Sequence, residues 1–178
     1  MTRQEFAVSP LSRVAWLWLL VPSLALLAGA WLHASRVATP APGSLLAPFM
    51  LALVLVVPWL ALRRRRTAIE GRELVVAAAF HTRHVALDAL DLVQARIVDL
   101  AEHTGYRPML GLNRFGLPTY RAGHYLLRNR KRAFCLLTAT DRVLVLPQRD
   151  GRVLLLSPER PRELLDRLRE LASPPPHR

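Results

Sequence analysis

The chain has 178 residues, a formal net charge of +12 and an apolar content of 52%. This apolar share is high for a water-soluble domain and is typical of chains that contain membrane-spanning segments. The single cysteine, Cys135, excludes an internal disulfide and a cysteine-ligated metal cluster, and its apolar neighbours predict a buried thiol.

Two apolar segments in the first third of the chain predict a pair of membrane-spanning helices. Residues 14–33 and 44–62 each have about 20 residues, the length that an α-helix needs to cross about 30 Å of hydrocarbon. The link between them, residues 34–43, is short, rich in proline and nearly uncharged. These features predict a helical hairpin that is preceded by a short cytoplasmic segment, residues 1–13.

The second apolar segment ends at four consecutive arginines, which are Arg63, Arg64, Arg65 and Arg66. Basic residues accumulate in the short cytoplasmic flanks of membrane helices. Residues 63–72 are therefore predicted to form a basic stop at the membrane surface, with both termini in the cytoplasm. Membrane adjacency explains the arginines without nucleic acid, and each basic residue near anionic headgroups contributes about 1 kcal/mol.

The first apolar segment has a second interpretation. A basic start, an apolar run and the small residues "LAGA" are also found in cleaved signal peptides. The length of the run and its tryptophans favour a retained helix. Both interpretations leave the C-terminal half in the cytoplasm, because the arginines follow the second segment.

The C-terminal half predicts one compact domain over residues 73–172, followed by a disordered tail over residues 173–178. The segments "ELVVAAAF" and "RHVAL" are typical of paired strands. Residues 85–100 fit either a strand or a helix, because their apolar residues satisfy both periods. Residues 101–119 are rich in glycine and proline and predict a long loop, which is usually functional or disordered in a compact domain.

Four short strands are predicted next, over residues 120–128, 132–138, 142–147 and 152–156. Asp150-Gly151 is a strong hairpin turn, whereas Asn129-Arg130 is a poorer one because arginine disfavours positive φ. A helix follows over residues 157–172, with Ser157 as its predicted N-cap. One face of this helix is apolar and carries Leu164, Leu165, Leu168 and Leu171.

This pattern predicts a membrane α-hairpin followed by an α+β, mainly β domain. The segments "GLPTYRAGHYLLRNRKRAF" and "TDRVLVLPQRDGRVLLLSPERPRELLDRL" resemble the bacterial PH-like domain of small two-span membrane proteins. The resemblance covers about residues 110–170, and the matching positions are Gly116, Pro118, Tyr120, Gly123, Asn129, Asp141, Gly151, Ser157 and Pro158. It implies a bent antiparallel barrel of about seven strands, closed by a C-terminal helix, without catalysis. Arg130 departs from the pattern, which has glycine there.

Few residues carry a pattern typical of chemistry. His81 and His84 would point to opposite faces of a strand, which does not suit one metal ion. Ser157 has no histidine and aspartate arranged around it, and "GLNRFG" lacks the lysine of a phosphate-binding loop. We therefore expect no catalytic, cofactor or metal site.

The predicted long loop and its flank combine aromatic and basic residues, which are Tyr106, Arg107, Arg114, Phe115, Tyr120 and Arg121. In one interpretation Phe115 and Tyr120 cover the open end of the barrel and the arginines are solvated. In the other, the group is a docking surface for anionic headgroups or an acidic protein, because arginine and aromatic residues are favoured at both.

These observations predict a non-catalytic protein of the bacterial inner membrane whose PH-like domain binds a protein or anionic lipids. The expected partners are the lipid bilayer, anionic headgroups and an unidentified protein or second copy of the chain, and not nucleic acid. The alternative is an accessory subunit of a membrane transporter or enzyme complex that acts through the hairpin. The hairpin could not transport ions alone, because its apolar segments carry no Asp, Glu, Lys or Arg.

Overall fold

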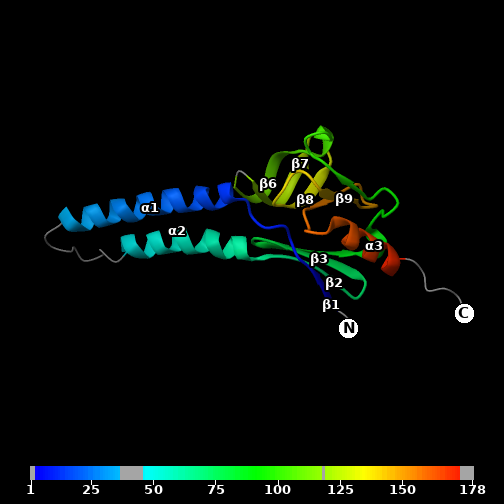
Figure 1. Cartoon of the computed structure of the whole chain (residues 1–178), viewed down its shortest axis with the longest axis horizontal. Coiled ribbons are helices and arrows are strands. Elements are labelled where there is room, and N and C mark those ends of the chain that lie inside the picture. Colours follow the sequence, from blue (N-terminus) through cyan, green and yellow to red (C-terminus); the bar gives the residue numbers. More distant parts are fainter. Residues whose placement is uncertain (1–2, 37–45, 118, 173–178) are drawn as a thin grey trace, which may run out of the picture.

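The structure is a computed structural model that describes residues 3–36, 46–117 and 119–172. Two antiparallel helices project from a β domain that contains both the first strand and the last helix (Figure 1). The tail 173–178 and most of the predicted link lie outside the described residues.

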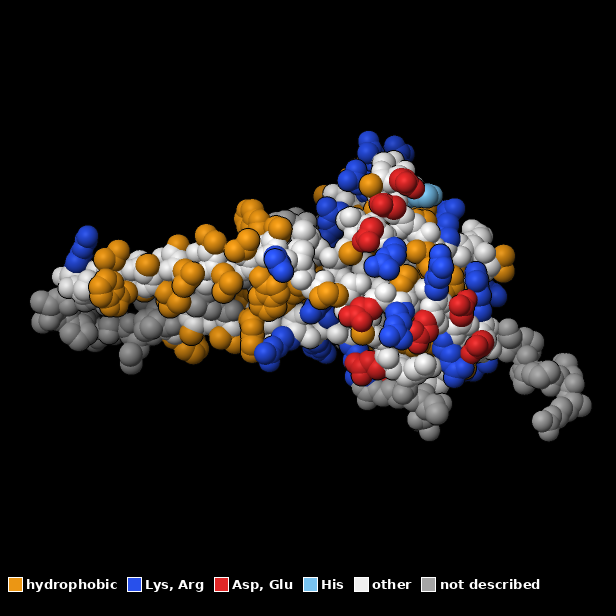
Figure 2. Space-filling model, viewed as in Figure 1, with side chains coloured by type: hydrophobic (Ala, Val, Ile, Leu, Met, Phe, Trp, Pro, Cys, Tyr) orange, Lys and Arg blue, Asp and Glu red, His pale blue; other side chains and the backbone are white. Residues whose placement is uncertain are grey.

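The two projecting helices, α1 (Arg13–Arg36) and α2 (Leu46–Arg63), lie side by side and expose their apolar side chains. Figure 2 shows hydrophobic side chains along the hairpin and mixed charges over the domain. Among the described residues, Arg13–Leu32 is long and apolar enough to cross a membrane, and nearly all of this segment is exposed outside the domain. The described apolar part of α2, Phe49–Arg63, is shorter, and the predicted segment 44–62 begins outside the described residues.

The first sheet contains a strand from before the hairpin and three from after it. Its antiparallel order is β1 (Arg3–Phe6), β2 (Arg65–Glu70), β3 (Glu73–Ala78) and β4 (His81–Ala86). The β domain therefore extends beyond the predicted residues 73–172. Residues 1–13 contribute β1 to it, and residues 63–72 contribute β2. After the hairpin, the chain comes back beside its first strand. There Arg3 of β1 pairs with Glu70 of β2, and Phe6 pairs with Thr67.

The second sheet has six strands in the order β5-β9-β10-β8-β7-β6. The pair β8–β10 is parallel and the other neighbours are antiparallel. The strands are β5 (Arg96–Val98), β6 (Pro108–Leu117), β7 (Tyr120–Leu127), β8 (Arg132–Leu137), β9 (Val143–Pro147) and β10 (Val153–Leu156). Residues 85–100 resolve into the end of β4, the short 3-10 helix η1 (Leu87–Ala89) and β5.

The predicted long loop is wrong for most of its length, because ten of its residues form β6. Glycine and proline are typical of loops, and they led to the prediction of a loop. Because β6 is an edge strand, it can accommodate proline and bulges. The pairing of β6 with β7 shifts register between Pro108 and Leu110 and again between Gly111 and Asn113. The edge position therefore explains why the composition misled.

Four turns contain a residue with positive φ, and two of these residues are not glycine. Ala79 takes φ +53° in the β3–β4 turn. Gly71 joins β2 to β3 with φ +63°, and Gly151 joins β9 to β10 with φ +81°. Arg130 takes φ +62° in the β7–β8 turn, where the Asn129 side chain accepts a hydrogen bond from the amide of Lys131. The predicted turn is formed, but it places an arginine in the left-handed region.

The final helix, α3 (Pro161–Ala172), buries Leu164, Leu165 and Leu168 as its apolar stripe predicts. It packs against a core cluster that contains residues of both sheets. Ser157 is not its N-cap, because the helix begins four residues later and the Ser157 hydroxyl donates to the Ala139 carbonyl at 3.1 Å. The segment after β1 bonds to residues 157 and 159 and holds them extended.

The six-stranded sheet buries side chains on both faces. One face joins the main core through residues such as Leu136 and Leu154, and the other forms a second cluster around Cys135 and Leu155. The prediction of a mainly β domain with a C-terminal helix is confirmed. The described residues contain ten strands, and eight of them lie within the predicted domain 73–172, where about seven were predicted; β6 is the strand that the prediction missed. The barrel is not closed, and β4 and β6 remain edge strands.

Candidate functional site

The four arginines after α2 do not share one environment. The Arg63 guanidinium lies 3.7 Å from the centre of the Trp59 ring, and Arg63 and Arg64 are exposed. Arg65 and Arg66 belong to β2 and are partly buried. Only the first two are therefore free to meet a surface at the junction between hairpin and domain.

The two arginines in β2 hold the domain to its neighbouring segments. The Arg65 side chain donates from Nε to the Leu62 carbonyl at 2.7 Å and from Nη1 to the Ser9 carbonyl at 3.4 Å. Arg66 pairs with Glu5 of β1 at 3.1 Å and with Glu70 at 3.5 Å. These contacts assign the second half of the quartet to the fold.

The six residues predicted as an interaction surface fall into two separate groups. Tyr106 ends the 3-10 helix η2 (Thr104–Tyr106), and Arg107 directly precedes β6. Arg114 and Phe115 lie near the C-terminal end of β6. Tyr120 and Arg121 are the first two residues of β7. At about 3.3 Å per residue along a strand, the two groups lie on the order of 25 Å apart.

Phe115 and Tyr120 close the end of the domain that faces the hairpin. Their ring centroids are 6.1 Å apart in an edge-to-face arrangement, and Phe115 makes a similar contact with Phe80 at 5.7 Å. Tyr120 is fully buried, and this burial raises its pKa to about 12 although the charge of Arg65 acts in the opposite direction. These aromatic residues thus belong to the packing of the domain.

The remaining members of the predicted surface are not united with them. At the far end of β6 the Arg96 guanidinium lies 5.1 Å from the centre of the Tyr106 ring and bonds its hydroxyl. Arg107 is exposed, Arg121 is partly buried, and Arg114 is described only by its strand position opposite Gly123. The structure does not bring the six residues into one site.

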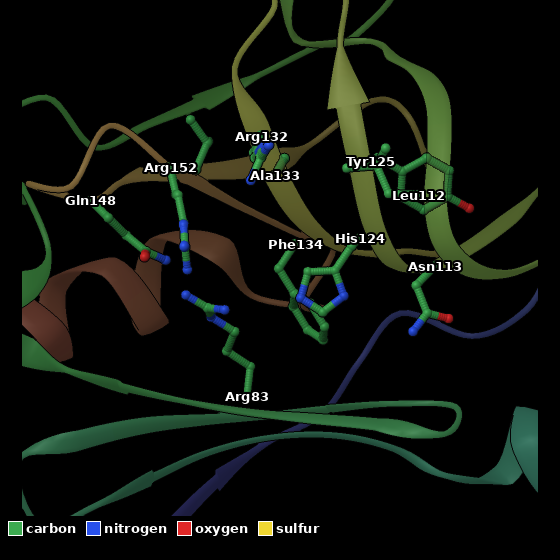
Figure 3. Close-up of a pocket in the computed structure, with 11 residues that line it drawn as sticks. Arg83, Leu112, Asn113, His124, Tyr125, Arg132, Ala133, Phe134, Gln148 and Arg152 are labelled. Atoms are coloured by element: carbon green, nitrogen blue, oxygen red, sulfur yellow. The ribbon is translucent and has the colours of Figure 1, made fainter.

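A different set of basic residues lines a pocket of about 320 Å³ between the two sheets (Figure 3). The charged, imidazole and amide side chains of the lining come from β4, β6, β7, β8 and the connection between β9 and β10. They are Arg83, Asn113, His124, Arg132, Gln148 and Arg152. The rest of the lining is mostly apolar. None of the described lining residues is acidic.

Two arginines of this basic pocket, Arg83 and Arg152, point toward each other. Figure 3 shows Arg83 rising from β4 toward Arg152, with His124 beside them. The Arg83 Nε is buried and has no hydrogen-bond partner within the described part of the chain. Arg152 pairs with exposed Asp150 at 3.5 Å, outside the lining. Positive charge is therefore concentrated in a partly enclosed space.

His124 reports this concentration of charge. Its pKa lies below the usual value, first because of burial and then because of electrostatic repulsion from His81, Arg83 and Arg152. Its ring lies edge-to-face with His81 at 5.7 Å and with Phe134 at 5.0 Å. The pocket disfavours an additional cation and suits an anion.

The two histidines of "HTRH" do not act together. His81 contacts His124 between the sheets, while His84 pairs with Glu73 at 3.4 Å, as alternation along a strand predicts. Sequence reasoning missed the basic pocket because its residues come from five strands and from the β9–β10 connection. The sequence feature that could have indicated the pocket is Arg83, which lies between these histidines. In sequence it looks like an ordinary exposed arginine.

Comparisons with protein-family models, with curated proteins and with solved structures find no match for this chain. The resemblance to bacterial PH-like domains therefore remains a prediction from sequence.

Proposed function

We propose that this chain is a non-catalytic membrane protein that crosses the bilayer twice and presents a PH-like domain at the cytoplasmic face. There the domain binds anionic lipid or a protein partner. The single observation that carries this proposal is the pairing of β1, which precedes the hairpin, with β2, which follows it.

This pairing constrains the topology. Four residues of β1 are in register with β2, and Phe6 is buried in the domain core. A single crossing between the two strands would separate them by about 30 Å of hydrocarbon. An even number of crossings leaves them on one side, which supports a two-span hairpin.

The charges at the junction support the cytoplasmic side for the domain. Arg13 begins α1, while Arg63 and Arg64 end and follow α2, and all three are exposed. Basic flanks of this kind are retained in the cytoplasm. The cation–ring contact between Arg63 and Trp59 suits an interfacial position, where amphipathic rings are favoured.

The same strand pairing bears on signal-peptide cleavage. Cleavage within α1 would remove β1, leave the edge of β2 unpaired and expose the core around Phe6. Retention of α1 preserves these contacts. This supports the interpretation of α1 as a permanent membrane helix.

Reporter fusions at each end of the full chain test the topology. A fluorescent protein that matures only in the cytoplasm is expected to be active at both ends, and an alkaline phosphatase that works only outside is expected to be inactive at both. Activity of the phosphatase after Arg178 would overturn the proposal. Fusions at residue 40, in the predicted link, serve as the control and should give the opposite pattern.

Interaction is tested with the full-length protein, because a fragment that begins after the four arginines, at residue 67, would lack β1 and the start of β2. The protein in nanodiscs is expected to recruit additional anionic vesicles, and Arg63→Gln with Arg64→Gln should reduce this recruitment. Arg160→Gln is the control, because Arg160 is an exposed arginine directly before α3. Co-purification of a stoichiometric membrane protein would favour the accessory-subunit alternative.

A further inference from the structure

We propose that the basic pocket between the two sheets binds a phosphomonoester, carried by a small molecule or by a lipid headgroup. Nothing in this inference depends on the proposed two-span topology, because every residue that it uses belongs to the β domain. The residues that carry it are Arg83, Arg132, Arg152 and His124, with Asn113 and Gln148 as further donors.

The first argument is the concentration of positive charge inside the pocket. Arg83 and Arg152 approach from opposite walls, Arg152 pairs with Asp150 only outside the lining, and no acidic side chain lies in the described lining between the two arginines (Figure 3). Like charges that face each other repel, most strongly where protein excludes water. A dianion placed between them would replace this repulsion with attraction on both sides.

The second argument separates Arg83 from an ordinary surface arginine. Arg132 and Arg152 are exposed, so their charged groups can be solvated without a ligand. Arg83 is partly buried, and its Nε lacks both a hydrogen-bond partner and contact with water. Buried guanidinium donors are normally paired, and the forked donors of arginine match phosphate oxygens.

The third argument concerns the shape and composition of the ligand. A volume of about 320 Å³ exceeds that of a bare phosphate ion and leaves room for a small organic body. The apolar part of the lining, which includes Leu112, Phe134 and Val153, can pack against that body. A phosphomonoester carries up to two negative charges near neutral pH, which suits several arginines better than one carboxylate does.

Calorimetric titration of the full chain in nonionic detergent tests the inference. Inorganic phosphate and glycerol 3-phosphate are the probes, at low ionic strength. Both are expected to bind, with glycerol 3-phosphate the tighter. Arg83→Gln should weaken both at least tenfold. Arg142→Gln, an exposed arginine that pairs with Asp141 outside the pocket, should bind like the wild type.

Three results would overturn the proposal. The first is the absence of binding heat with both probes. The second is equal weakening by Arg83→Gln and Arg142→Gln, which would indicate general charge attraction. Thermal unfolding midpoints of the variants distinguish a loss of binding from a loss of the fold. Without anion, Arg83→Gln should melt at or above the wild type, because it removes a repulsion. A lowered midpoint together with lost binding would assign Arg83 to the fold and also overturn the proposal.

The source of the phosphate is distinguished in nanodiscs. If a headgroup fills the pocket, discs that contain phosphatidic acid should weaken glycerol 3-phosphate binding more than discs with phosphatidylglycerol at equal surface charge, since phosphatidylglycerol has no phosphomonoester. Equal affinity in both discs would assign the pocket to a soluble phosphomonoester. These titrations and the reporter fusions report separately, so failure of one proposal leaves the other measurable.

Discussion

The hairpin and the β domain expose opposite kinds of surface. In the hairpin, large apolar side chains project outward, and Trp18 and Trp31 are 60% and 71% exposed. In the domain the leucines of β10 and three leucines of α3 are buried, while charged side chains of both signs lie over the face that Figure 2 shows. The boundary between these regimes falls inside the arginine quartet, since Arg64 is exposed and Arg65 is bonded into the fold. A run of identical residues therefore does not imply one role.

The largest expected effect is a loss of stability from a substitution in β1, the strand that precedes the hairpin. Phe6→Ala should reduce the free energy of unfolding of the domain by about 3 kcal/mol, because it leaves a cavity in the core. Labelling of Cys135 in increasing urea measures it, since this sole cysteine is fully buried. Trp18→Ala is the control, and an equal effect from both variants would contradict the placement of β1.

A smaller effect is expected within the quartet. Arg65→Ala should cost about 1 kcal/mol, because it removes the hydrogen bonds to the carbonyls of Leu62 and Ser9. Arg64→Ala should change stability by less than about 0.5 kcal/mol, as exposed substitutions usually do. The same urea titration compares them. Equal losses would show that the two halves of the quartet share one environment.

The β7–β8 turn offers a gain in stability. Arg130→Gly should stabilise the domain by about 0.5 kcal/mol, because glycine adopts the observed left-handed φ without strain. Arg128→Gly is the matched variant, and it should destabilise because residue 128 has no positive φ. Urea midpoints of both variants provide the measurement. A loss of stability in Arg130→Gly would contradict the turn geometry.

The smallest expected effect is a pH dependence from His124. Its pKa is lower in the folded state than the usual 6.5, so the unfolded chain binds a proton first as the pH falls. Stability should therefore be unaffected above about pH 7 and should decrease as the pH falls below about 6.5. His124→Gln should reduce this slope in urea midpoints measured from pH 7.5 to 5. Exposed His103→Gln should retain it.

Burial of Cys135 also raises the pKa of its thiol, which keeps it protonated and unreactive in the folded domain. Apolar neighbours in sequence were sufficient to predict this. The strands after residue 120 were equally predictable, since each is an apolar run between turn formers. The fold class of this half follows from local pattern.

The errors occur where distant segments decide the local structure. β1 has only four residues, too few for a periodic signal, and it is a strand because β2 pairs with it. The glycines and proline of β6 are tolerated because that strand lies at an edge. Ser157 is extended because residues 7 and 9 bond beside it. None of these partners is near in sequence.

The sequence by itself determined the apolar hairpin, the basic junction, the apolar stripe of α3 and the buried thiol, because these depend on composition and short-range periodicity. Tertiary structure alone decided that β1 completes the first sheet, that the quartet divides, and that Arg83, His124 and Arg152 surround one pocket. The physical reason is that strand pairing and the facing of two sheets join residues far apart in the chain. Local pattern carries no record of which distant residues those will be.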